Sequence, residues 1–317
     1  MTKTLILSFL LAGISFLSAQ TTTEVTAEGS VLEKFALQSP SMGREIAVAV
    51  LLPSSYTKNT SSLPTLYALH GKKAPYLTFM NMPPLRRFVE NHPMLVVSFD
   101  GGEDSCYIDA TNRKNSYYTK FFFEELLPEI ARRYRTNGQN AVTGFSMGGF
   151  GALHYVFTRP QAFTSASALS GAFTLFEDHG DNDRFAKWEA EIQGKREENL
   201  ADYEAVALSA RLKKIMETDT KLPPLLLMCG TGDFLKDANR QFIDRIHGLN
   251  MSQLKKHDLD FQTYAEKKEN RAKIEEVEKN RFIDFEYRET NGGHDWWYWL
   301  QSIEAIAEFH WQHFSKK

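Results

Sequence analysis

Cysteine is scarce in this sequence, since Cys106 and Cys229 are the only two among 317 residues. A single pair excludes the disulfide-dense scaffold of small secreted domains. The two settings also differ, because Cys229 ends the apolar run LPPLLLMC whereas Cys106 lies in a polar loop. We expect two free thiols, and one disulfide is the alternative. No Cys or His pair has the spacing of a metal site, so we expect no bound metal.

Long apolar runs are missing after the first twenty residues. The opening, MTKTLILSFLLAGISFLSAQ, has a lysine, then an apolar stretch, then Ser18 and Ala19. This order is typical of a secretory signal peptide, here residues 1–19 with cleavage after Ala19. An uncleaved membrane anchor is the alternative, but the stretch falls short of the roughly 20 residues that a spanning helix needs. We therefore predict a secreted or periplasmic domain over residues 20–317, without stable membrane insertion.

An excess of charge of one sign is also missing. The formal net charge is -3, with 24% charged and 42% hydrophobic residues, which is ordinary globular composition. Binding to nucleic acid needs a concentrated basic face, so we exclude nucleic acid as an obligatory partner. The length allows one large core or two modest ones, and the composition does not predict the oligomeric state.

Short apolar runs recur along the chain and alternate with helical patterns. The strand candidates are GREIAVAVLLP, PTLYALHG, MLVVSFD, NAVTGF, TSASALSG, PPLLLMCG and FIDFEYRET. The helix candidates are YYTKFFFEELLPEIARRY, GGFGALHYVF and a segment from about 297 to 314. Strands that alternate with helices are typical of βαβ units. We predict an α/β fold in which helices flank a mostly parallel central sheet.

Two charged segments interrupt this alternation. Residues 174–204 follow the TSASALSG run and lack a strand pattern, so we interpret them as a lid-like insertion. Residues 248–281 contain AEKKENRAKIEEVEKN, whose alternating charges favour a solvated helix. We interpret them as a charged helical insertion, and a partner-binding arm is the alternative.

The stretch AVTGFSMGGFGAL contains a candidate nucleophile, Ser146. A serine hydroxyl is a poor nucleophile unless a neighbouring base takes its proton. The pattern G-x-S-x-G between a strand and a helix is typical of a nucleophile elbow, which exposes the hydroxyl on a sharp turn. The alternative is a solvent-exposed serine in a glycine-rich turn.

The order of acid and base along the chain supports the elbow. In α/β-hydrolases an Asp or Glu and then a His follow the serine. Asp233 comes directly after the PPLLLMCG run, at the end of a parallel strand where binding loops gather. Asp237 is the competing carboxylate, but it lies in or at the start of the next helix. His294 follows the last strand candidate and a glycine pair, so we predict Ser146, Asp233 and His294 as a triad.

A tetrahedral intermediate also needs preorganised donors for its oxyanion. One is the backbone N–H of the residue after the nucleophile, Met147. The second comes from the loop after an earlier strand, where LYALHGKKAP places Lys72 after His70 and Gly71. We assign Lys72 by its backbone N–H and not by its ammonium group.

With these residues in place, the chain resembles the esterase D-like branch of the α/β-hydrolases, which includes tributyrin-type carboxylesterases and feruloyl and acetyl-xylan esterases. The stretches that carry the resemblance are LHG, DGGEDSCYIDA, EELLPEIARRY, GFSMGGFGAL, RPQAFTSASALSG, CGTGDFLKDANRQF and GGHDWWYW. The resemblance implies an α/β-hydrolase fold, no cofactor, and the catalytic roles given to Ser146, Asp233 and His294. The chain departs from the pattern at Cys106, where relatives often have tryptophan, and in GKKAP after the His-Gly pair.

The leading hypothesis is an exported serine carboxylesterase that acts through an acyl-enzyme on a small ester or an ester-bearing carbohydrate. Trp296 and Trp297 adjoin His294 and are candidates to stack on a sugar or a phenolic acyl group, and Cys106 is a candidate wall of the substrate pocket. One alternative is an acyltransferase that passes the acyl group to a carbohydrate. The other is a non-catalytic carbohydrate-binding protein on the same fold.

Overall fold

A computed structural model describes residues 21–178, 184–218, 220–259 and 268–314. The predicted signal peptide, residues 1–19, lies outside the described residues and stays a prediction. Parts of both predicted insertions, 179–183 and 260–267, also lie outside them. Among the described residues, no helix has the length and apolar character needed to cross a membrane.

Within this described part, the strands form one mixed sheet in the order β1-β2-β3-β5-β4-β6-β7-β8-β9. The bounds are β1 Thr22–Val25, β2 Val31–Ser39, β3 Arg44–Leu52, β4 Leu63–Leu69, β5 Leu95–Phe99, β6 Thr136–Gly144, β7 Ser165–Leu169, β8 Leu225–Gly230 and β9 Phe285–Thr290. The pairs β1–β2, β2–β3 and β3–β5 are antiparallel. The other six strands, β4 to β9, pair with one another in parallel. They correspond to the six later strand candidates of the sequence. The predicted fold class is confirmed.

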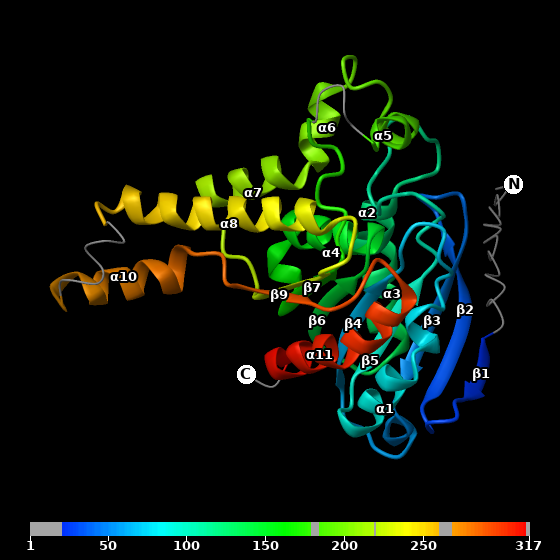
Figure 1. Cartoon of the computed structure of the whole chain (residues 1–317). Helices are drawn as coiled ribbons and strands as arrows, with labels where there is room; N and C mark the ends of the chain where they lie inside the picture. The colour runs from blue at the N-terminus through cyan, green and yellow to red at the C-terminus, as the bar shows by residue number, and fades with distance from the viewer. Residues whose placement is uncertain (1–20, 179–183, 219, 260–267, 315–317) are drawn as a thin grey trace, which may run out of the picture.

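Helices cover both faces of the sheet (Figure 1). Their bounds are α1 Pro83–Asn91, α2 Tyr118–Lys120, α3 Leu127–Arg133, α4 Met147–Thr158, α5 Ala186–Gln193, α6 Leu200–Val206, α7 Leu208–Glu217, α8 Lys236–Lys256, α10 Lys268–Arg281 and α11 Trp296–Phe314. A π-helical stretch, Phe121–Leu126, joins α2 to α3, and 3-10 turns lie at Ser54–Thr57, Phe79–Asn81 and Pro160–Ala162. The core side chains of α1 and α11 belong to one apolar cluster, and those of α3, α4, α7 and the first half of α8 belong to another.

The buried strands supply side chains to both clusters by simple alternation. On β4, Tyr67 and Leu69 join the cluster under α4, while Leu66 and Ala68 join the cluster under α11. Successive side chains of a strand point to opposite faces, so a strand covered on both faces is apolar throughout. This accounts for the unbroken apolar runs in the sequence.

His310 attaches α11 to the sheet. Its two ring nitrogens each lie 2.8 Å from a serine hydroxyl of β7, those of Ser165 and Ser167. Burial lowers the pKa of His310 to about 3, so the ring is neutral near pH 7. The attachment fixes the helix that begins two residues after His294.

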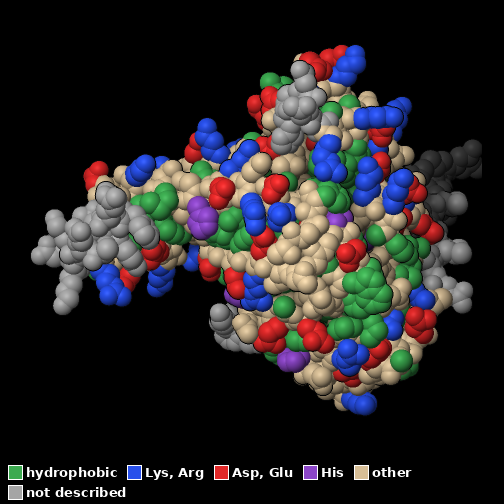
Figure 2. Space-filling model, viewed as in Figure 1, with side chains coloured by type: hydrophobic (Ala, Val, Ile, Leu, Met, Phe, Trp, Pro, Cys, Tyr) green, Lys and Arg blue, Asp and Glu red, His purple; other side chains and the backbone are tan. Residues whose placement is uncertain are grey.

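The helices α8 and α10 form an arm that projects from the body of the molecule (Figure 1), and acidic and basic side chains are mixed over its surface (Figure 2). α8 begins at Lys236, so residue 248 lies inside a helix and does not start an inserted one. The arm has an apolar cluster of its own, formed by Leu254, Leu259, Ile274 and Val277. The charged segment is therefore partly packed and not solvated all round.

Candidate active site

Ser146 occupies a sharp turn between β6, which ends at Gly144, and α4, which begins at Met147. Its backbone has φ 56° and ψ −119°. A non-glycine residue at positive φ is uncommon and costs of order 1–3 kcal/mol. The surrounding sheet and helix hold this conformation, which is the elbow that the sequence predicts.

Glycines on both sides of Ser146 allow this turn because backbone atoms come close to them. A Cβ on Gly144 would lie 2.2 Å from the carbonyl oxygen of Gly148. A Cβ on Gly148 would lie 2.0 Å from the carbonyl oxygen of Leu69. Both distances are far below van der Waals contact, so the glycine spacing follows from the packing of α4 against β4 and β6.

Three predicted residues from separate loops meet at this elbow. His294 Nε2 lies 3.0 Å from Ser146 Oγ. His294 Nδ1 lies 3.1 and 3.0 Å from the two carboxylate oxygens of Asp233. Nucleophile, base and orienting acid thus form one chain of hydrogen-bond contacts, which is the geometry of a catalytic triad.

The Asp233 carboxylate is held in its ionised form. Burial favours the protonated acid, but the contact with His294, the nearby Ser170 hydroxyl and the Leu235 N–H outweigh it and lower the pKa of Asp233 below its usual range. The Leu235 N–H donates to Asp233 Oδ1 at 2.7 Å. The competing carboxylate, Asp237, is exposed in the first turn of α8, and the triad contacts are made by Asp233.

The two predicted oxyanion donors lie in the elbow and in the loop beside it. Leu69 pairs with Gly144, so the ends of β4 and β6 lie side by side. Met147 is the first residue of α4, where backbone N–H groups lack an acceptor within the helix. Lys72 lies in the loop after β4 and lines the same cavity as Ser146.

Ser146 and His294 open into a cavity of about 380 Å³ with aromatic walls. It is lined by Gly71, Lys72, Lys73, Ala74, Phe145, Ser146, Ala172, Phe185, Trp188, Phe234, Leu235, His294 and Trp299. Phe234 and Trp299 contact the His294 ring, with centroids 4.5 and 5.4 Å away. Among the described residues, no group of three or more His, Cys, Asp or Glu side chains could hold a metal ion.

The predicted substrate-binding residues lie elsewhere. Trp297 is 74% exposed, and Trp296 packs against the core cluster beneath α11. Cys106 is fully buried, and burial raises the pKa of its thiol well above the usual value. Within the described chain, these three residues are not part of the cavity lining.

Trp188 and Trp299 supply the aromatic walls in their place. Trp299 stacks on Phe145 with centroids 4.1 Å apart, so α11 presents this ring one turn after Trp296. Trp296 and Trp299 are three residues apart and so share one face of α11, whereas Trp297 lies on another. This spacing could have suggested that the three rings do not all reach the site. Trp188 comes from the 174–204 segment, which the sequence predicts to be lid-like, but the sequence does not indicate which of its side chains reaches Ser146.

A scan against family models matches residues 39–310 to the family described as "Putative esterase". The chain belongs to this esterase family. Esterase Rv1288 of Mycobacterium tuberculosis is 34% identical over 156 residues, which are 46% of this chain but only 33% of that protein. The Acetyl esterase of Caldicellulosiruptor saccharolyticus is 24% identical over 260 residues, which cover 79% of this chain and 84% of that protein.

The solved structures extend the likeness to the fold. The fluorophosphonate-binding serine hydrolase FphF of Staphylococcus aureus matches with a TM-score of 0.66 and 21% identity, over 89% of this chain and 98% of that one. At this identity the match establishes the α/β-hydrolase fold and no more.

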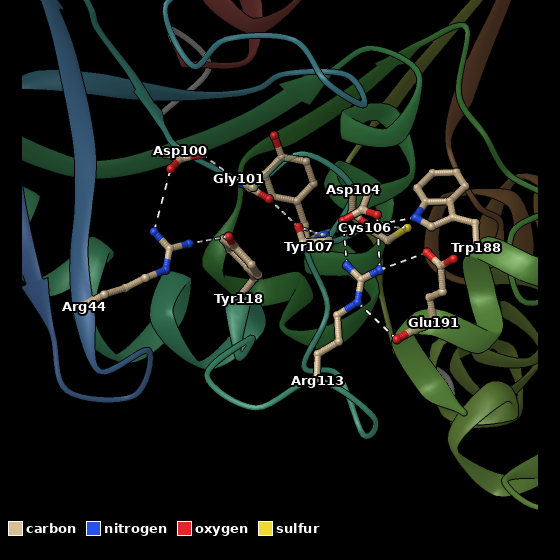
Figure 3. A network of polar contacts seen from close by, with 12 residues as sticks. Arg44, Asp100, Gly101, Asp104, Cys106, Tyr107, Arg113, Tyr118, Trp188 and Glu191 are labelled. Atoms are coloured by element: carbon tan, nitrogen blue, oxygen red, sulfur yellow. Dashed lines mark hydrogen bonds and ion pairs between the residues drawn. The ribbon is translucent and has the colours of Figure 1, made fainter. Parts of the chain in front are cut away.

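In this esterase-family chain, hydrogen bonds and ion pairs connect the 174–204 segment to the loop after β5 (Figure 3). Arg113 donates to both carboxylate oxygens of Asp104, at 2.6 and 3.1 Å, and pairs with Glu191 of α5 at 3.5 Å. Trp188 Nε1 donates to the Asp104 carbonyl at 2.8 Å. The ion pair with Asp104 raises the pKa of Arg113. These contacts fix Trp188 as a wall of the cavity, and the predicted lid is anchored at α5.

We expect Gly148→Ala to lose about 1–3 kcal/mol of stability through overpacking and about 100-fold in kcat/KM through displacement of Ser146. The cause is the forced separation of α4 from the Leu69 carbonyl. Gly248→Ala on α8 is the matched control, because a Cβ there meets no atom within 4 Å. Thermal melting and hydrolysis of p-nitrophenyl acetate measure both effects. Equal behaviour of the two variants would contradict the packing argument.

Proposed function

We propose that the protein is an exported serine carboxylesterase that hydrolyses small carboxylic esters through an acyl-enzyme. The observation that carries this proposal is the continuous chain from Ser146 Oγ through His294 to Asp233, with contacts of 3.0 to 3.1 Å. Its membership of an esterase family supports the same chemistry. The complete triad argues against a non-catalytic binding protein.

The reaction follows from these positions. His294 Nε2 takes the proton of Ser146 as Oγ attacks the ester carbonyl, and the Asp233 carboxylate stabilises the imidazolium that forms. The backbone N–H groups of Lys72 and Met147 hold the oxyanion, each worth about 3 kcal/mol in the transition state. His294 then gives the proton to the leaving alcohol, which departs and leaves an acyl group on Ser146. A water molecule, deprotonated by His294, releases the acid and restores the hydroxyl.

An acetyl or phenolic ester on a carbohydrate is the substrate class we favour. The rings of Trp188 and Trp299 line the cavity, and their aromatic surface supports packing against a sugar or a phenolic group. A distant relative is named as an acetyl esterase, and that name supports the smaller acyl group.

The proposed hydrolysis is tested by product analysis. Purified protein is given acetyl, butyryl and feruloyl esters with and without xylan-type oligosaccharides, and the released acid and acylated sugar are quantified. We expect free acid at the same rate whether or not oligosaccharide acceptors are present. Acyl groups found mainly on the oligosaccharide would replace the hydrolase with the acyltransferase, and absence of both products would contradict the proposal.

A further inference from the structure

Three cationic side chains lie in or beside the lining of the cavity that contains Ser146. Lys72 and Lys73 belong to its lining. The guanidinium carbon of Arg184 lies 4.6 Å from the centroid of the Phe234 ring and 5.1 Å from that of Phe185, and both rings are walls of the cavity. Positive charge therefore reaches the site from the loop after β4 and from the 174–204 segment.

None of the three cations is paired with a carboxylate in the part of the chain that the structure describes. Lys72 Nζ lies 3.6 Å over the Trp188 ring, so its contact is a cation–π interaction. Among the described residues, the Arg184 guanidinium likewise lies over two aromatic rings, those of Phe185 and Phe234. A ring face attracts a cation without neutralising its charge, so each ammonium or guanidinium group keeps donors for an anion.

Three of the acidic side chains near the cavity, among the described residues, already have partners. Asp104 is bound by Arg113, and Asp233 by His294. Asp295 Oδ1 accepts the Tyr298 N–H at 3.0 Å. The lining itself contains no aspartate or glutamate among the described residues. Since the whole chain has a net charge of -3, the group of cations at the cavity is a local feature and not a reflection of overall composition.

Like charges gathered around an apolar cavity repel one another unless an anion lies between them. Charge-assisted hydrogen bonds to a carboxylate or phosphate are about twice as strong as neutral ones. We propose that Lys72, Lys73 and Arg184 form an anion subsite and that the preferred substrates are esters carrying a negatively charged group near the scissile bond. This inference rests on the proposed esterase activity.

Two pairs of matched esters test the subsite and show which half of the substrate carries the charge. The acyl pair is the mono-p-nitrophenyl ester of adipic acid and p-nitrophenyl hexanoate. The alcohol pair is 4-acetoxybenzoate and 4-acetoxybenzamide. For each pair the readout is the ratio of kcat/KM for the anionic ester to that for the neutral one, in wild type, in Lys72→Gln, Lys73→Gln and Arg184→Gln, and in the triple variant.

In at least one pair we expect the ratio to fall about tenfold for each cation removed and to fall in wild type as salt is raised. Lys213→Gln is the control, because Lys213 pairs with Glu217 on α7 and does not line the cavity; its ratios should equal those of wild type. A variant that is partly unfolded loses activity on both esters and leaves the ratio intact.

The outcomes separate this inference from the proposed function. Hydrolysis of the neutral esters with ratios that are equal in wild type and the triple variant would overturn the anion subsite and leave the esterase standing. Failure to hydrolyse either member of both pairs would overturn the esterase itself.

Discussion

Replacing Ser146 by alanine is expected to lower kcat for p-nitrophenyl acetate by about a millionfold. The serine and His294 act as a unit, because the base at 3.0 Å has no proton to take once the hydroxyl is gone. The residual rate then comes from the oxyanion donors and from substrate binding alone. Steady-state kinetics with a purified variant measure this loss.

The fold of the Ser146→Ala variant should remain intact. Alanine must adopt the same backbone φ of 56° as serine, and only one hydroxyl is removed from a side chain that is partly accessible in the cavity. A melting temperature close to that of wild type is the control. Substantial turnover by this folded variant would refute the role of Ser146.

Asp233→Asn is expected to lower kcat by about ten-thousandfold. An asparagine amide can donate to His294 Nδ1 and so stabilise the wrong tautomer, in which Nε2 carries the proton and cannot act as a base. The amide also cannot stabilise the imidazolium. The loss should appear in kcat more than in KM, since the carboxylate contacts His294 and the Leu235 N–H and does not line the cavity.

Asp237→Asn is the matched control for this effect. It makes the same chemical change four residues along the chain, at an exposed position in the first turn of α8. We expect only the small loss of a favourable charge at a helix N-terminus, about 0.3–1 kcal/mol of stability, with kcat near that of wild type. If Asp237→Asn were the crippled variant, the assignment of the acid would be wrong.

The sequence predicted those parts of the site that are set by local backbone chemistry. The glycines around Ser146 indicate a tight turn, and four of the six later runs are strands buried along their whole length, β4, β5, β7 and β8. The prediction of a buried strand is wrong for FIDFEYRET, because β9 is a partly exposed strand at the edge of the sheet. Asp233 and His294 follow two of these strands, so their place at one sheet edge follows from parallel topology. Each inference needed only the residue type and its distance from an element end.

The walls of the cavity could not be predicted in this way. Trp188 reaches the site because Arg113 and Asp104, far away in sequence, hold α5 in place. Trp297 follows the base by three residues, yet it is 74% exposed to solvent, and Trp299 lines the cavity. Such contacts depend on the packing of separate elements, and a one-dimensional pattern does not contain that information.

Covalent labelling of the wild-type protein by a fluorophosphonate probe tests the central claim most directly, because such a reagent forms a stable bond to an activated serine oxygen. Intact mass and peptide mapping should show one adduct, on Ser146, that is absent from Ser146→Ala and forms far more slowly in Asp233→Asn. An adduct on another residue, or none on a folded protein, would contradict the assignment of Ser146 as the nucleophile.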